Sequence, residues 1–143
     1  MHDLFEKMLK ENQLCVLCTE SQSAPHCSRM TYILDEERRT LYLITSMHSR
    51  KYKNLMENKN VSVLIDSRQQ LEVGSTYPIV SVTFDGVLTE IEKPRLEEIR
   101  VHFRERHPEL EEILIQDSCI IFSVQLKTYL LLNGPVQVVQ GEL

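Results

Sequence analysis

Short apolar runs separated by polar turns dominate the first half of the chain. Residues 14–19, 27–34 and 40–45 have the length and composition of strands. The turn residues at 21–25 and the charged residues at 35–39 separate these runs. The pattern therefore predicts an antiparallel meander.

Four segments instead repeat their apolar residues every three or four positions, which is typical of amphipathic helices. Residues 3–12 are predicted to form a short N-terminal helix, and residues 49–58 a helix of two or three turns. Pro94 is placed to open a third helix, and Pro108 restarts a shorter helical segment. We expect these helices to pack outside the strands.

Further strands are predicted along the rest of the chain, at residues 60–66, 78–91, 119–126 and 129–132. Gly86 lies inside the second of these runs and predicts a bulge or bend of the kind that closes barrels. The polar segment 67–77 could form a lid or a contact with a partner chain, and no element is predicted there. About six strands with outer helices predict a mainly β fold, a small closed or split β-barrel, in a single domain over residues 1–143.

Composition and charge limit the function. The chain is 42% hydrophobic and 26% charged, which excludes a disordered tail or linker. Its formal net charge of −5 disfavours binding to nucleic acid. There is no apolar stretch of the roughly 18 residues that span a bilayer, and the first residues do not resemble a secretory signal. We therefore expect a cytoplasmic protein with neither a nucleic-acid nor a membrane partner.

The four cysteines are expected to be free thiols, as is usual in a reducing compartment. They are Cys15, Cys18, Cys27 and Cys119. Cys15 and Cys18 have the spacing of half a zinc site, but residues three apart on a strand point to opposite faces. No metal site is predicted.

Residues 44–51 place hydroxyl and cationic side chains where a strand is expected to end and a helix to begin. These side chains belong to Thr45, Ser46, Ser49, Arg50 and Lys51. A helix N-terminus presents unpaired N–H groups and a partial positive charge, so the segment could hold a phosphate dianion. Arg29 would reach the same place if the two preceding strands pair. In the alternative interpretation, Ser49 is only a helix cap and the two cations are a solvated surface.

The chain resembles the FMN-binding split barrels related to pyridoxamine 5′-phosphate oxidase. The resemblance lies in residues 28–32 (SRMTY), 41–51 (LYLITSMHSRK), 54–55, 58 and 61–64, with weaker agreement at 82–86. It implies a six-stranded antiparallel split β-barrel of Greek-key type, a homodimer, and FMN bound at the dimer interface.

The resemblance also implies which residues bind the cofactor. The phosphate would be held by Arg29, Ser49, Arg50 and Lys51, with Thr45 and Ser46 in the same loop. The isoalloxazine and ribityl groups would be lined by Met30, Thr31, Tyr32 and Ile44.

Two departures from the family limit what the resemblance implies about the reaction. The C-terminal residues 133–143 lack the Arg- and His-containing arm that grips the vitamin B6 substrate, and Ser81 stands near the place of a glutamine that contacts the flavin. We therefore expect an FMN-dependent oxidoreductase or electron carrier that acts through the flavin ring. Its partner would be a small redox substrate, with a nicotinamide nucleotide as one candidate, and no catalytic side chain is predicted. The alternatives are a haem- or deazaflavin-binding split barrel and a cofactor-binding module without turnover.

Overall fold

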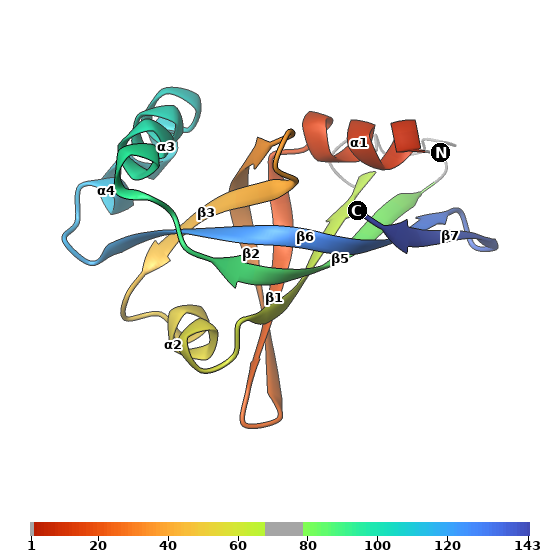
Figure 1. Cartoon of the computed structure of the whole chain (residues 1–143), viewed down its shortest axis with the longest axis horizontal. Coiled ribbons are helices and arrows are strands. Elements are labelled where there is room, and N and C mark those ends of the chain that lie inside the picture. The colour runs from red at the N-terminus through yellow and green to blue at the C-terminus, as the bar shows by residue number, and fades with distance from the viewer. Residues whose placement is uncertain (1, 68–78) are drawn as a thin grey trace.

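One antiparallel sheet with helices around it makes up the fold (Figure 1). The structure is a computed structural model that describes residues 2–67 and 79–143. The strands are β1 (Leu14–Ser21), β2 (Ala24–Asp35), β3 (Thr40–Ser46), β4 (Asn60–Asp66), β5 (Val80–Thr89), β6 (Cys119–Asn133) and β7 (Gln137–Glu142). The helices are α1 (His2–Glu11), α2 (Arg50–Glu57), α3 (Lys93–Arg106), the 3-10 turn η2 (Pro108–Leu110) and α4 (Glu111–Leu114). The four predicted helical segments are confirmed.

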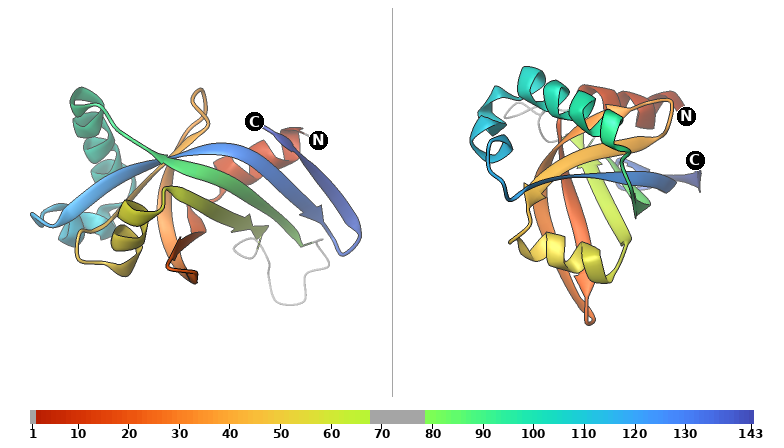
Figure 2. Two further views of the ribbon diagram at one scale, coloured as in Figure 1. Left: turned by 60° about the horizontal axis from the view of Figure 1, so that its bottom comes forward. Right: turned by 60° about the vertical axis from the view of Figure 1, so that its left-hand side comes forward.

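The sheet closes on itself through its first six strands. Its strand order is β3-β2-β1-β4-β5-β6-β7, and β3 also pairs with β6 from Thr40–Gln125 to Ser46–Cys119. This pairing joins the two ends of the six-stranded part, as predicted for a split barrel. The seventh strand, β7, pairs only with the second half of β6 and extends beyond the closed part (Figure 2).

The C-terminal strands differ from the prediction. The runs at 119–126 and 129–132 belong to one continuous strand, β6. The hydrophobic pattern does not predict β7, whose residues are mostly exposed, with Val138 56% accessible. A strand held by backbone pairing at the rim of a sheet lacks the buried alternation by which strands are recognised.

Gly86 forms the predicted bulge. The β5–β6 register shifts between Asp85 and Gly86, so that one residue of β6 is left unpaired. A Cβ atom at position 86 would lie 2.7 Å from Val124 Cγ1 and 2.9 Å from the Gln125 carbonyl oxygen. The close approach of β6 therefore requires glycine.

Two apolar clusters stabilise the fold. The larger fills the barrel and contains side chains such as Leu43, Phe84 and Val124, all fully buried. The smaller lies between the other face of β3 and helix α3, where Tyr42 packs with Phe103. Strand β3 is therefore buried on both faces, which explains its unbroken apolar sequence.

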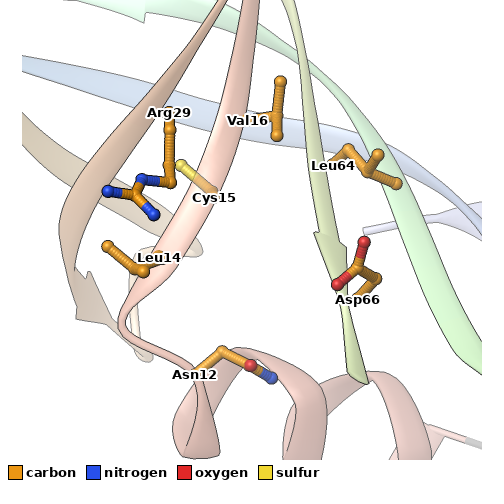
Figure 3. Close-up of a pocket in the computed structure, with 7 residues that line it drawn as sticks. All are labelled: Asn12, Leu14, Cys15, Val16, Arg29, Leu64 and Asp66. Carbon is orange, nitrogen blue, oxygen red and sulfur yellow. The ribbon is translucent and has the colours of Figure 1, made fainter. Parts of the chain in front are cut away.

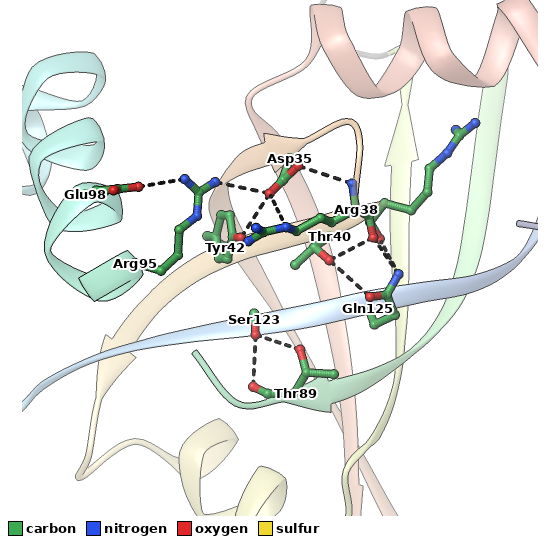
Figure 4. Close-up of polar contacts among 10 residues, drawn as sticks. Asp35, Arg38, Thr40, Tyr42, Thr89, Arg95, Glu98, Ser123 and Gln125 are labelled. Carbon is green, nitrogen blue, oxygen red and sulfur yellow. Dashed lines mark hydrogen bonds and ion pairs between the residues drawn. The ribbon is translucent and has the colours of Figure 1, made fainter. Parts of the chain in front are cut away.

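A polar cluster fastens α3 to the β2–β3 hairpin (Figure 4). Asp35 Oδ2 accepts hydrogen bonds from Arg95 Nη2 at 3.1 Å and from Tyr42 Oη at 3.2 Å. Arg38 donates its backbone N–H to Asp35 Oδ1 at 3.2 Å. The Arg95 guanidinium also lies 5.6 Å from the centre of the Tyr42 ring. These groups partner one another, which indicates a structural role.

The segment 67–77 is predicted to form either a lid or a contact with a partner chain. Its residues 68–77 lie outside the described residues. In the described part of the chain, every helix is too short or too polar to cross a membrane.

Candidate cofactor site

The barrel is split between β2 and β3. These strands pair from Asp35–Thr40 to Tyr32–Leu43 and no further, although β3 continues to Ser46 and β2 extends back to Ala24. Beyond this point β2 pairs with β1, and β3 pairs with β6. In Figure 1 the lower part of β2 runs away from β3, which continues towards α2. Continued past the end of the ladder, the same register brings Arg29 level with Ser46.

The β2 side of the split presents unpaired backbone groups. Tyr32 donates its N–H to the Gln13 carbonyl at 3.0 Å, on the β1 side. Since backbone groups of successive strand residues point to opposite sides, those of Thr31 and Arg29 point away from β1, towards the split. Because the ladder with β3 ends at Tyr32–Leu43, the N–H of Thr31 and both backbone groups of Arg29 have no strand partner on this side and can hydrogen-bond to a planar ligand.

The β3 side of the split leads into the N-terminus of α2. Ser49 caps this helix, because its Oγ accepts the Tyr52 N–H at 3.2 Å. The Thr45 hydroxyl lies 2.9 Å from Ser49 Oγ, and Ser46 Oγ accepts the His48 N–H at 3.2 Å. The three predicted hydroxyls thus gather at one helix terminus.

Three cationic side chains accompany these hydroxyls. Arg50 and Lys51 occupy the first turn of α2, which contains no acidic residue. Arg29 lies exposed on the outer face of β2. Across residues 2–67 and 79–143, none of the three takes part in an ion pair or side-chain hydrogen bond. The charge at the split is therefore available to an anion.

Arg29 lines a groove of about 270 Å³ on the outer face of the barrel (Figure 3). The groove runs across β2, β1 and β4, and its other lining residues are Asn12, Leu14, Cys15, Val16, Leu64 and Asp66. Burial raises the pKa of the Cys15 thiol to about 12, so Cys15 stays protonated and adds no charge to the groove. The contributions of Asn12 and Asp66 are not predicted from the sequence, because β1 and β4 reach Arg29 only through long-range pairing.

Three of the predicted cofactor residues have side chains that point into the core. Met30 and Tyr32 belong to the cluster inside the barrel, and the Tyr32 hydroxyl donates to the Leu9 carbonyl at 2.6 Å. Ile44 packs in the cluster under α3. The backbone groups of Met30 and Tyr32 point towards β1, so neither residue is placed to hydrogen-bond to a ligand in the split.

A buried hydroxyl without a partner adjoins the same edge. Ser28 Oγ precedes Arg29 on β2 and has no hydrogen-bond partner among the described residues. Leaving such a group unpaired costs about 1–3 kcal/mol, so a polar ligand is favoured beside it. The donor set as a whole, with hydroxyls, cations and a free backbone edge, suits a phosphate-bearing cofactor.

The fold and this opening define a split-barrel protein. The sequence profile of the family described as pyridoxamine 5′-phosphate oxidase matches residues 1–139. The chain therefore belongs to the pyridoxamine 5′-phosphate oxidase family, and the resemblance inferred from the sequence is confirmed. No curated protein matches the chain in sequence.

Solved structures share the fold at low sequence identity. A haem-binding protein from Mycobacterium smegmatis superposes with a TM-score of 0.79 at 16% identity, over 95% of this chain and 55% of that chain. General stress protein 26 from Bacillus anthracis superposes with a TM-score of 0.69 at 20% identity, over 99% of this chain and 100% of that chain. An FAD-binding protein from Mesorhizobium loti superposes with a TM-score of 0.68 at 19% identity, over 96% of this chain and 91% of that chain. This chain therefore spans about half the length of the first protein and nearly all of the other two.

Proposed function

We propose that this chain binds FMN in the split between β2 and β3 and acts as an FMN-dependent oxidoreductase or electron carrier. The observation that carries the proposal is the N-terminus of α2, where hydroxyls gather beside cations that have no carboxylate partner among the described residues. Membership of the family and the likeness to an FAD-binding protein support a flavin.

The phosphate would be held by the groups at the β3–α2 junction. Ser49 and Thr45 supply hydroxyls, and the unpaired N–H groups of the first helical turn point out of the helix. Arg50 and Lys51 add charge, and Arg29 adds a planar guanidinium from β2. A dianion at this position is favoured by the helix dipole as well.

The ring system would lie along the free edge of β2. The backbone N–H and C=O groups of Arg29 and the N–H of Thr31 can pair with the acceptors and donors of the pyrimidine edge of a flavin. When bound, FMN supplies hydride or single-electron transfer, while the protein supplies position and access. The substrate is then a small redox molecule, and a nicotinamide nucleotide is one candidate.

A second copy of the chain would complete the site. Arg29 is exposed on the outer face of β2, and the groove of about 270 Å³ beside it lies on the same face. A homodimer that covers this face would enclose the cofactor and shield the exposed sheet. The measured mass in solution, with and without FMN, tests this part of the proposal.

Ligand titration tests the phosphate site. We expect the purified protein to bind FMN at least about a hundredfold more tightly than riboflavin, which lacks the phosphate, because several charge-assisted bonds are lost. Lys51→Met should weaken FMN binding about tenfold or more and leave riboflavin unaffected. Lys53→Met, an exposed lysine on the same helix, is the matched control. Equal affinity for FMN and riboflavin would exclude the proposed pocket.

Haem is the second candidate ligand. The fold matches that of a haem-binding protein, and His48 is exposed in the turn that leads into α2. A Soret band in the absorption spectrum of the purified protein, lost in His48→Ala, would favour haem. Two absorption maxima, in the blue and the near ultraviolet, would favour flavin, and the mass of the extracted ligand separates FMN from FAD and from a deazaflavin.

A further inference from the structure

Two cysteines face each other across the β1–β2 hairpin, outside the proposed cofactor contacts. Cys18 and Cys27 are register partners, and their Sγ atoms lie 3.2 Å apart. Both side chains point to the outer face of the sheet, where Cys27 is exposed and Cys18 half-buried. Cys15 points to the other face, into the core. The pair is therefore accessible to reagents that Cys15 does not meet.

The hairpin geometry suits a disulfide between Cys18 and Cys27. The Tyr32–Gln13 hydrogen bond fixes which pairs of this ladder are hydrogen-bonded, and the alternation makes Cys18–Cys27 a non-hydrogen-bonded pair. The Cα atoms of such a pair lie about 4.5 Å apart, within the roughly 4.4–6.8 Å range of disulfides. To form the bond, the sulfur atoms need to approach each other by only about 1 Å, to roughly 2.05 Å.

The turn beside the pair holds this register. Gln22 and Ser23 both have positive φ values, 52° and 64°, which indicates a tight two-residue turn. Because only these two residues separate the paired residues Ser21 and Ala24, the turn fixes the register in which Cys18 faces Cys27.

We propose that Cys18 and Cys27 form a reversible dithiol–disulfide site that is oxidised by hydrogen peroxide. In the first step the Cys27 thiolate attacks a peroxide oxygen and the O–O bond breaks. Cys27 becomes a sulfenic acid, and the departing hydroxide leaves as water after taking up a proton. The Cys18 sulfur then attacks the Cys27 sulfur, the S–O bond breaks, and the second hydroxide leaves as water with the Cys18 proton. Two thiols and one peroxide thus give one disulfide and two waters.

The environments of the two sulfurs assign these roles. Cys27 is the more exposed and meets the oxidant first. Burial and the neighbouring Cys27 thiol raise the pKa of Cys18 to about 11, so Cys18 remains a thiol until the sulfenic acid forms beside it. Its sulfur is then already within 3.2 Å of its target.

Peptide mapping tests the proposal without relying on activity. The native protein is treated with hydrogen peroxide, the remaining thiols are alkylated in denaturant, and the chain is cleaved after glutamate. Cleavage after Glu20 separates residues 12–20, which contain Cys18, from residues 21–36, which contain Cys27. We expect these peptides to remain linked in the oxidised protein and to separate on reduction.

Serine variants identify the partners and control for Cys15, which lies on the same peptide as Cys18. The link should persist in Cys15→Ser and disappear in Cys18→Ser and in Cys27→Ser, of which the last changes an exposed side chain. The melting temperature should rise by about 5 °C or more on oxidation of the wild type, and remain unchanged in Cys27→Ser. A link through Cys15, a link only between two chains, or a stable Cys27 sulfinic acid with no link would each overturn the proposal.

Discussion

Substitution of Ser49 separates its structural role from its proposed role in phosphate binding. Its hydroxyl caps α2 by accepting the Tyr52 N–H, and it also pairs with the buried Thr45 hydroxyl at 2.9 Å. In the proposed function the same hydroxyl contacts the phosphate. Aspartate and asparagine cap helices about as well as serine, whereas alanine does not cap. The variants Ser49→Ala, Ser49→Asn and Ser49→Asp are therefore expected to differ in their combinations of stability and affinity for FMN.

The expected magnitudes follow from these contacts. Ser49→Ala removes a cap worth about 1 kcal/mol and costs about 1–3 kcal/mol more by leaving Thr45 unpartnered. Ser49→Asn and Ser49→Asp retain both contacts and should change the free energy of unfolding by less than about 0.5 kcal/mol. A carboxylate about 4 Å from a phosphate costs between ~1 and ~4 kcal/mol per phosphate charge, depending on the effective dielectric constant. Ser49→Asp should therefore weaken FMN binding by at least about tenfold.

Two assays check the series. Urea unfolding followed by circular dichroism gives the stability of each variant, and fluorescence titration gives its affinity for FMN and for riboflavin. The expected result is a stable Ser49→Asp protein that has lost most of its affinity for FMN and kept its affinity for riboflavin. If Ser49→Asp binds FMN as tightly as the wild type, the phosphate is not at the N-terminus of α2.

Three further predictions concern the framework around the site. Gly86→Ala should lower the free energy of unfolding by about 2 kcal/mol in urea unfolding, because the new Cβ meets the Gln125 carbonyl oxygen at 2.9 Å; an unchanged midpoint would contradict this. Asp35→Asn should cost about 1–2 kcal/mol by weakening the contact between α3 and the hairpin, whereas Glu98→Gln, at an exposed partner of the same arginine, should cost less than about 0.5 kcal/mol. Because the folded state raises the pKa of the Cys15 thiol from 9.0 to about 12, the unfolded state releases this proton first as pH rises. The associated stability, complete below pH 9, should be lost at higher pH, by about 2 kcal/mol near pH ~10.5, and Cys15→Val should flatten this dependence.

The sequence predicts the barrel well because its signals are local. Period-two alternation marks the central strands, Gly86 marks the bend, and proline marks the helix starts. Strand β7 carries no such signal, since pairing with β6 holds it while its side chains stay largely exposed. The end of the β2–β3 ladder at Tyr32–Leu43 is equally invisible, because it depends on pairing between segments that are distant along the chain.

Part of the candidate site can likewise be predicted from local sequence, and part cannot. The hydroxyls and cations of residues 45–51 are contiguous, so their meeting at one helix terminus follows from the local strand-to-helix pattern. The resemblance implies that Arg29 holds the phosphate and that backbone and side chains of residues 30–32 line the rest of the ligand, yet a strand turns alternate side chains to opposite faces. Arg29 and Thr31 accordingly face outwards, whereas Met30 and Tyr32 fill the core.

The charges near the split argue for an anionic ligand rather than a merely solvated surface. Most arginines in the described part of this acidic chain lie within 4 Å of a carboxylate, as Arg39 does with Glu6. Arg106 is an unpaired exception, but it lies in the last turn of α3, where the helix dipole favours a cation. Arg50 and Lys51 lie at the opposite kind of terminus, where the dipole disfavours them and no acidic side chain of the first turn compensates. A phosphate bound between the helix N-terminus and these two cations would attract both. The net electrostatic energy of this end of α2 would then be favourable, and the same pair of side chains would stabilise the complex.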